Sequence, residues 1–202
     1  MAIKTSNSGG DFQKCPEGMH VARCFKIIDC GTHVNPQFGK AQRKGWVFFE
    51  LPNALMEANE KGDRYPFVVG KRYTLSHNEK AQLRMDLESW YGKTFNTVDL
   101  DKAGGFDLEK LVGRPAMINV VHSEDGKYAN IKSINPMPNG MECPSQINES
   151  FIFSIDDVNN PAKLEKLSDK MKEFIMQAQE IAGKPAMATA NTAPDFDDDI
   201  PF

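Results

Sequence analysis

In the first 75 residues, apolar positions gather in three short stretches that are separated by more polar segments. Residues 20–29 (HVARCFKIID) form the first, residues 45–51 (GWVFFEL) the second and residues 71–75 (KRYTL) the third. All three contain β-branched or aromatic side chains, which are typical of strands that place one face against a core. The pattern therefore predicts three strands, with residues 52–66 as a polar connection between the second and the third.

After residue 75 the period becomes helical. Ser76 and Glu79 have the spacing of a capping box, in which a helix begins at the serine. Apolar residues then recur at helical spacing at Leu83, Leu87 and Trp90, and Gly92 follows as a stop signal. The sequence predicts one helix here, and its apolar stripe places Trp90 in the core.

Two further strands are predicted as a hairpin. Residues 114–122 (RPAMINVVH) and 127–134 (KYANIKSI) flank a turn with an Asp-Gly hairpin signal at residues 124–126. Three strands, a helix and a two-stranded hairpin follow one another in the order of the OB-fold, a five-stranded Greek-key barrel with a helix between strands three and four. The predicted fold class is mainly β (α+β), with the barrel over residues 15–138.

The C-terminal quarter has a different organisation. Residues 139–183 are predicted as an irregular connection followed by one amphipathic helix, with Asn160 as its cap and Pro161 in its first turn. Its apolar stripe consists of Leu164, Leu167, Met171, Phe174, Ile175 and Ala178. Residues 184–194 (KPAMATANTAP) are predicted as a linker before a disordered acidic tail, and residues 1–14 as a flexible arm.

Charge divides the chain in the same way. Residues 1–150 hold 19 Lys and Arg against 18 Asp and Glu, whereas residues 151–202 hold 5 against 10, so the acidity lies at the C-terminal end. There is no apolar run long enough for a membrane span and no signal peptide. The four cysteines, Cys15, Cys24, Cys30 and Cys143, are therefore expected to be reduced thiols in a cytoplasm.

Cations and aromatic rings alternate on the predicted strands. Val47, Phe49 and Leu51 share one face of the second strand and look like core, so Trp46 and Phe48 would project from the outer face beside a basic loop. Rings interleaved with Lys and Arg suit single-stranded nucleic acid, because bases stack on the rings and cations neutralise phosphates. The expected DNA-binding residues are Arg23, Phe25, Lys40, Arg43, Lys44, Trp46, Phe48, Arg72, Tyr128 and Lys132.

Other interpretations of the same residues stay open. Aromatic rings on strands are often core, in which case Trp46 and Phe48 pack inside the protein instead of contacting DNA. Cys15, His20, Cys24, Cys30 and His33 lie close together in sequence, but they lack a paired C-x-x-C, and neither a metal site nor a cofactor is predicted. Because no recognised catalytic motif occurs, an enzyme is not expected either.

The last eight residues read DFDDDIPF. An acidic run that ends in two large apolar side chains and a terminal carboxylate suits a docking peptide, with Asp residues steering it to a basic surface. This end resembles the C-terminal tip of bacterial single-stranded DNA-binding proteins (SSBs), which recruits replication and repair enzymes. The resemblance assigns partner binding to Asp195, Phe196, Asp197, Asp198, Asp199, Ile200, Pro201 and Phe202.

Residues 15–135 also resemble phage-type OB-fold proteins, in the stretches HVARCFKIIDCGT, YTLSHNEKAQLRMDLESWYGK and FDLEKLVGRPAMINV. They do not match the core of ordinary bacterial SSBs, so a tetramer is not implied and the oligomeric state is left open. The expected function is sequence-independent single-stranded DNA binding in replication, recombination and repair, in a bacterium or a phage-infected cell. Two alternatives stand beside it: an adaptor or decoy that competes for host SSB partners, and a DNA-binding accessory subunit of a nuclease or recombinase.

Overall fold

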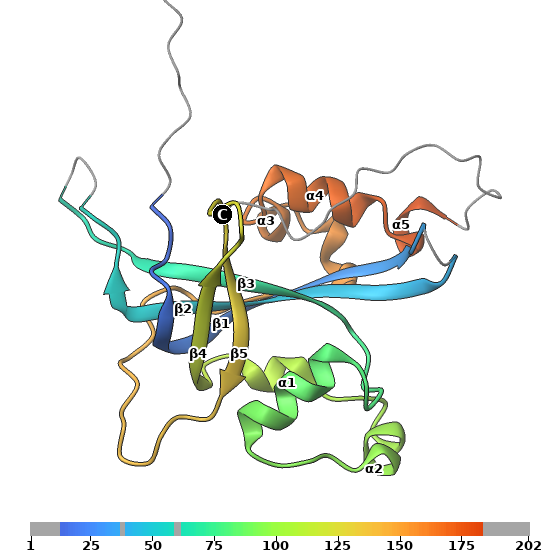
Figure 1. The fold of residues 1–202 in the computed structure, drawn as a ribbon. Coiled ribbons are helices and arrows are strands. Elements are labelled where there is room, and N and C mark those ends of the chain that lie inside the picture. Colours follow the sequence, from blue (N-terminus) through green and yellow to red (C-terminus); the bar gives the residue numbers. More distant parts are fainter. Residues whose placement is uncertain (1–12, 37–38, 59–61, 184–202) are drawn as a thin grey trace, which may run out of the picture.

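The computed structural model describes residues 13–36, 39–58 and 62–183, and it is mainly β (Figure 1). Six strands form one sheet: β1 (Gly18–Val34), β2 (Ala41–Leu55), β3 (Pro66–Thr74), β4 (Pro115–His122), β5 (Ala129–Asn135) and β6 (Phe151–Phe153). Between β3 and β4 lie α1 (Gln82–Tyr91), α2 (Thr97–Lys102) and the 3-10 helix η1 (Leu108–Leu111). After β6 come η2 (Ile155–Asn159), α3 (Pro161–Leu164), α4 (Asp169–Met176) and α5 (Gln179–Ala182).

The long strand β1 organises the sheet. The strand order is β3-β2-β1-β4-β5, with antiparallel neighbours throughout, and β6 pairs with β1 in parallel. The first part of β1 pairs with β4 and its later part with β2, and register shifts after Cys24 and Asp29 bend the strand between these partners. The two ends of the path, β3 and β5, also contact each other, so the sheet curves around a core.

The inner face of the curved sheet holds the larger core. Val47, Phe49 and Leu51 of β2 are buried there, as the alternation in β2 predicts. Helix α1 closes this core with Trp90, which is 2% exposed and whose Nε1 donates a hydrogen bond to the Pro115 carbonyl at 2.8 Å. The predicted core position of Trp90 is confirmed.

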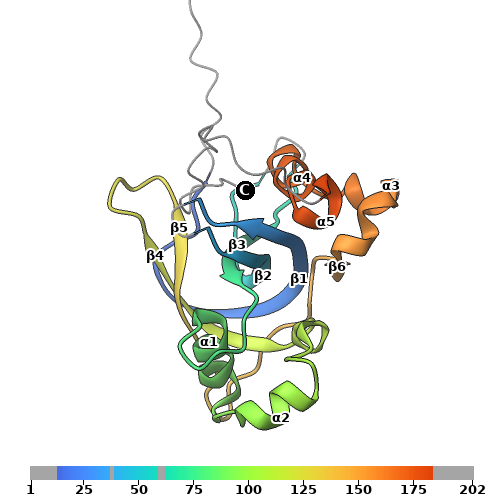
Figure 2. The ribbon, with the colours of Figure 1, turned by 90° about the vertical axis from the view of Figure 1, so that its right-hand side faces the viewer.

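The outer face of β1 and β2 is covered as well. Phe25, Trp46 and Phe48 are 7%, 5% and 1% exposed, because η2, α4 and α5 pack on them and form a second core. Leu167, Met171, Ile175 and Ala178 supply the covering side. Figure 2 shows α4 and α5 beside β1 on this side of the sheet. The alternation of faces in β2 was therefore predicted correctly, but the expected exposure of these three rings was wrong.

Local signals account for where most elements begin and end. Gly92 ends α1 in the left-handed region at φ 63°, as predicted, and Asn160 caps α3 with Pro161 in its first turn. The helix start at Ser76 was wrong, since α1 begins at Gln82. The Ser76 hydroxyl accepts from the Asn78 amide in a local turn, and the Glu79 carboxylate accepts from Thr97, so neither can form the capping box.

The structure also differs from the predicted element boundaries at β3 and in the C-terminal quarter. Strand β3 begins at Pro66, inside the predicted connection, while β6 and η2 lie in the stretch predicted as irregular. The predicted C-terminal helix is three short helices, because the Ser168 hydroxyl caps the Met171 amide and starts a new helix within the apolar stripe. The predicted N-terminal arm up to residue 12, the linker and the acidic tip lie outside the described residues.

Candidate nucleic-acid interface

The outer face of β2 and β3 carries two cations beside the second core. Arg72 pairs across the strands with Trp46, and its guanidinium carbon lies 5.8 Å from the centroid of that ring. Lys44 pairs with Thr74, and its Nζ donates to Thr74 Oγ1 at 2.8 Å and to Gln42 Oε1 at 2.7 Å. The antiparallel register thus places two side chains that are distant in sequence on adjacent cross-strand rows. We call Lys44 and Arg72 the basic pair.

The basic pair is electrostatically unbalanced. Burial and, secondarily, the charge of Arg72 lower the pKa of Lys44 below its ordinary value. Within the part of the chain that the structure describes, no carboxylate forms an ion pair with either side chain, and the two acceptors of Lys44 are neutral. An anion bound between them would offset this repulsion, which makes the pair a suitable phosphate contact.

Helix α4 adds an aromatic ring next to the basic pair. Phe174 stacks on His33 with the ring centroids 3.9 Å apart and meets Trp46 edge-on at 5.6 Å. Phe174 is half-buried, whereas Trp46 beneath it is almost fully covered. Burial is the main cause that lowers the pKa of His33; the Cys30 carbonyl and the charge of Glu180 oppose it, and the charges of Lys44 and Arg72 add to it. The stacked pair therefore lies near both cations and near Glu180. The ring that β2 was expected to present is therefore presented by α4.

The sequence did contain a signal that the outer face of β2 is covered by other side chains. Residues 45–51 are almost continuously apolar, a pattern that indicates a strand buried on both faces. The apolar stripe that includes Phe174 could supply the cover, but the stripe alone does not say which ring stays at the surface.

The β4–β5 hairpin lies on the other side of β3 from helices α4 and α5 (Figures 1 and 2). Of the predicted residues here, Lys132 is exposed on β5 and Tyr128 is half-buried just before it. The Tyr128 amide donates to the Ser123 hydroxyl at 3.0 Å, which holds the turn. Lys40, at the start of β2, is also exposed. Lys40, Lys132 and Tyr128 are therefore free to contact a ligand that crosses β3.

Arg23 and Arg43 already have partners within the protein. The Arg23 guanidinium donates to the carbonyl oxygens of Gly113, Cys143 and Pro144 at 2.6–3.2 Å, which fastens the segment after β5 to β1. Arg43 forms a two-point ion pair with Asp29, at 2.5 and 3.0 Å. Arg43 was expected to contact DNA, but the β1–β2 pairing brings Asp29 next to it.

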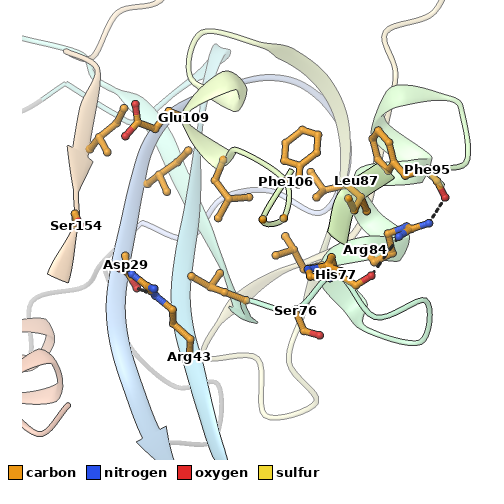
Figure 3. A pocket seen from close by; sticks show the side chains of 18 of the residues that line it. Asp29, Arg43, Ser76, His77, Arg84, Leu87, Phe95, Phe106, Glu109 and Ser154 are labelled. Atoms are coloured by element: carbon orange, nitrogen blue, oxygen red, sulfur yellow. Dashed lines mark hydrogen bonds and ion pairs between the residues drawn. The ribbon is translucent and has the colours of Figure 1, made fainter. Parts of the chain in front are cut away.

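A pocket of about 340 Å³ lies between α1, α2, η1 and the strands β1 and β6 (Figure 3). Both arginines of its lining are paired, Arg43 with Asp29 and Arg84 with Glu88 at 2.5 Å, and Glu109 adds a carboxylate to the wall. Most of the remaining lining is apolar, including Leu75, Leu83, Leu87, Leu100, Phe95 and Phe106. Its apolar lining and paired charges suit this pocket poorly to a phosphate backbone.

The cysteines pack as side chains of the interior. Burial raises the pKa of Cys15 to about 11, and Cys24 and Cys30 are fully buried. Over residues 13–36, 39–58 and 62–183, no group of three His, Cys, Asp or Glu side chains is arranged to hold a metal ion. The described helices include none that is long and apolar enough to cross a bilayer.

No protein-family model matches the chain, and no curated protein is significantly similar to it.

Proposed function

We propose that this protein binds single-stranded DNA independently of sequence, through an OB-fold body. The observation that carries the proposal is the basic pair, Lys44 and Arg72, which lies beside the half-buried ring of Phe174 without a carboxylate partner among the described residues.

The strand connectivity supports the OB-fold assignment. The order β3-β2-β1-β4-β5, the contact between β3 and β5, and helix α1 between β3 and β4 are the features expected of this Greek-key barrel. OB-folds bind oligonucleotides across strands two and three, between the loops that follow strands one and four. The basic pair lies on β2 and β3, the two strands whose face carries the oligonucleotide in this fold.

In this proposal each side chain has one role. Lys44 and Arg72 neutralise neighbouring backbone phosphates, and an unpaired base stacks on Phe174, a contact worth about 1–3 kcal/mol per base. A duplex keeps its bases stacked inside and cannot offer one to the ring, so single strands are preferred. Lys40, Tyr128 and Lys132 extend the contact on either side.

A titration with labelled oligothymidine and with a duplex of equal length tests the proposal. Wild-type protein should bind the single strand more tightly, with log affinity falling linearly against log salt. The double variant Lys44→Gln/Arg72→Gln should reduce that slope by about 1.4, since each lost phosphate contact on a single strand removes about 0.7. The control Lys80→Gln/Lys102→Gln removes two exposed cations elsewhere and should leave the slope unchanged. Equal affinity for duplex, or the same loss in both double variants, would contradict the proposal.

We also propose that the acidic tip, residues 195–202, docks genome-maintenance enzymes. The support is the sequence DFDDDIPF, whose terminal ring and carboxylate can enter one pocket together, while Pro201 limits the entropy lost on docking. Deleting the tip should abolish binding to a purified enzyme that binds bacterial SSB tips and should leave single-strand affinity intact. Adding one residue after Phe202 should have nearly the same effect on that enzyme. A tip-less protein that still binds the enzyme at full strength would refute this role.

A further inference from the structure

A third cation on the outer face is Lys26 of β1, which lies opposite Phe48 in the next cross-strand row from Trp46 and Arg72. Its Nζ is 5.0 Å from the centroid of the Phe48 ring and 5.7 Å from that of Phe151. Burial lowers the pKa of Lys26. Within the described ranges, no oxygen atom accepts a hydrogen bond from this ammonium, so its three donors face water or a ligand.

The ring of Phe151 carries a second cation. Lys166, two residues after α3, places its Nζ 5.6 Å from the Phe151 centroid, and Glu149 is its exposed ion-pair partner at 2.9 Å. A cavity of about 380 Å³ adjoins the ring, lined by residues at β6 and from α3 onward. Its lining consists of Ser150, Phe151, Ile152, Ala162, Lys163 and Lys166. Lys166 lines this space, and Lys26 approaches the same ring from outside the lining, so two ammonium groups and an aromatic ring lie beside a space large enough for a nucleotide.

We propose that this cavity binds one nucleotide of the single strand, with Lys26 and Lys166 on its phosphate and Phe151 against its sugar or base. The inference rests on the proposed function, because it extends the DNA path from the basic pair toward β6. Lys26 and Arg72 are two strands and two residues apart on one sheet face, a separation of roughly 12 Å at ordinary strand spacings. A strand of the 4–16 nucleotides that one OB-fold occupies is longer than this separation, and to contact both cations it would pass around α4, which covers Trp46 and Phe48 between them.

A structural role for Lys26 is the competing explanation. Its aliphatic stem covers Phe48, and the ammonium would then only reach out to water. Lys26→Met separates the two roles, because methionine keeps an apolar stem over Phe48 and removes the charge. Lys26→Arg restores the charge, and Lys102→Met removes an exposed lysine from α2 as the matched control.

The test is the salt dependence of oligothymidine binding by the full chain, with the thermal unfolding midpoint of each variant as a check on folding. Lys26→Met should lower the slope by about 0.7, Lys26→Arg should restore it, and Lys102→Met should leave it unchanged. Phe151→Leu should weaken binding about fivefold or more, through the lost stacking contact.

Two results would overturn the inference. Wild-type protein that binds oligothymidine, with Lys26→Met behaving like Lys102→Met, would contradict this site and leave the basic pair intact. An unchanged slope together with binding of poly-glutamate to wild type, but not to Lys26→Met, would assign the cavity to a protein carboxylate. Failure of the wild type to bind oligothymidine at low salt would instead refute the proposed function itself.

Discussion

Replacing Trp46 by alanine separates a core role from a DNA-contact role most clearly. The side chain is 5% exposed, lies edge-on to Phe174 at 5.6 Å and carries the Arg72 guanidinium at 5.8 Å. Loss of a buried tryptophan costs about 3–5 kcal/mol, of which the aromatic pair contributes roughly 0.5–1.5 kcal/mol. Trp46→Ala should therefore lower the free energy of unfolding by about 3–5 kcal/mol, a large share of the 5–15 kcal/mol typical of a domain.

Urea denaturation followed by far-UV circular dichroism measures this loss, with linear extrapolation to water. Tyr65→Ala is the matched control, since Tyr65 is an aromatic residue that is 50% exposed next to β3, and it should change stability by no more than about 0.5 kcal/mol. Single-strand affinity, expressed per folded molecule, should change little in Trp46→Ala. A stability loss below about 1 kcal/mol, combined with a loss of about 1–3 kcal/mol in DNA affinity, would place the ring on DNA and refute the second core.

Three further predictions concern Glu50, His33 and the cysteine thiols. Glu50 is fully buried, and its carboxylate accepts hydrogen bonds from the amides of Ile147 and Asn148 and from the Asn148 side chain, each at 2.7 Å. Glu50→Ala should therefore lower the free energy of unfolding in urea by about 3 kcal/mol or more, whereas a loss under about 1 kcal/mol would show that these hydrogen bonds are dispensable. Burial lowers the pKa of His33 from 6.5, so unfolding free energy should be fully present above about pH 6.5 and fall as the pH drops through the interval down to the folded pKa; a slope that persists in His33→Gln would assign it to other groups. Native protein should react with a thiol reagent first at half-buried Cys143 and only on unfolding at Cys24; rapid reaction of Cys24 would contradict its complete burial.

The faces of β2 and several helix ends could be predicted from the sequence because they depend only on neighbouring residues. Alternation in residues 45–51 separates Val47 and Phe49 from Trp46 and Phe48, and the structure keeps these two sets on opposite faces. Gly92, Asn160 and Pro161 mark helix ends through backbone conformation and capping alone. These signals require no knowledge of distant contacts.

What the sequence could not provide is the identity of the side chains that cover the outer face. That cover depends on the pairing of β6 with β1 and on the close approach of Ala178 to Gly31, at a distance in sequence of well over a hundred residues. A side chain at Gly31 would place its Cβ 2.7 Å from that of Ala178, so the contact relies on the missing side chain at φ 77°. Once this layer is in place, Trp46 and Phe48 become core, and the half-buried ring of Phe174 lies over the edge of Trp46.

The partners of the cations were equally hidden. Arg43 is fourteen residues from Asp29, and only the β1–β2 register brings them together, whereas Lys44, its neighbour in sequence, faces a threonine on β3. Neighbouring arginine and lysine residues therefore differ in their surroundings because of alternation: Arg43 forms an ion pair with Asp29, whereas Lys44 donates only to neutral oxygens.

The most direct test of the central claim is a map of backbone amide chemical shifts, by nitrogen-15 NMR, during titration of the full chain with oligothymidine. If the DNA crosses the outer face of β2 and β3, the largest shifts should fall at Lys44, Arg72 and Phe174 and in the β4–β5 turn, with little change along α1 and α2. Shifts confined to α1, α2 and the pocket of Figure 3, with none at the basic pair, would contradict the account.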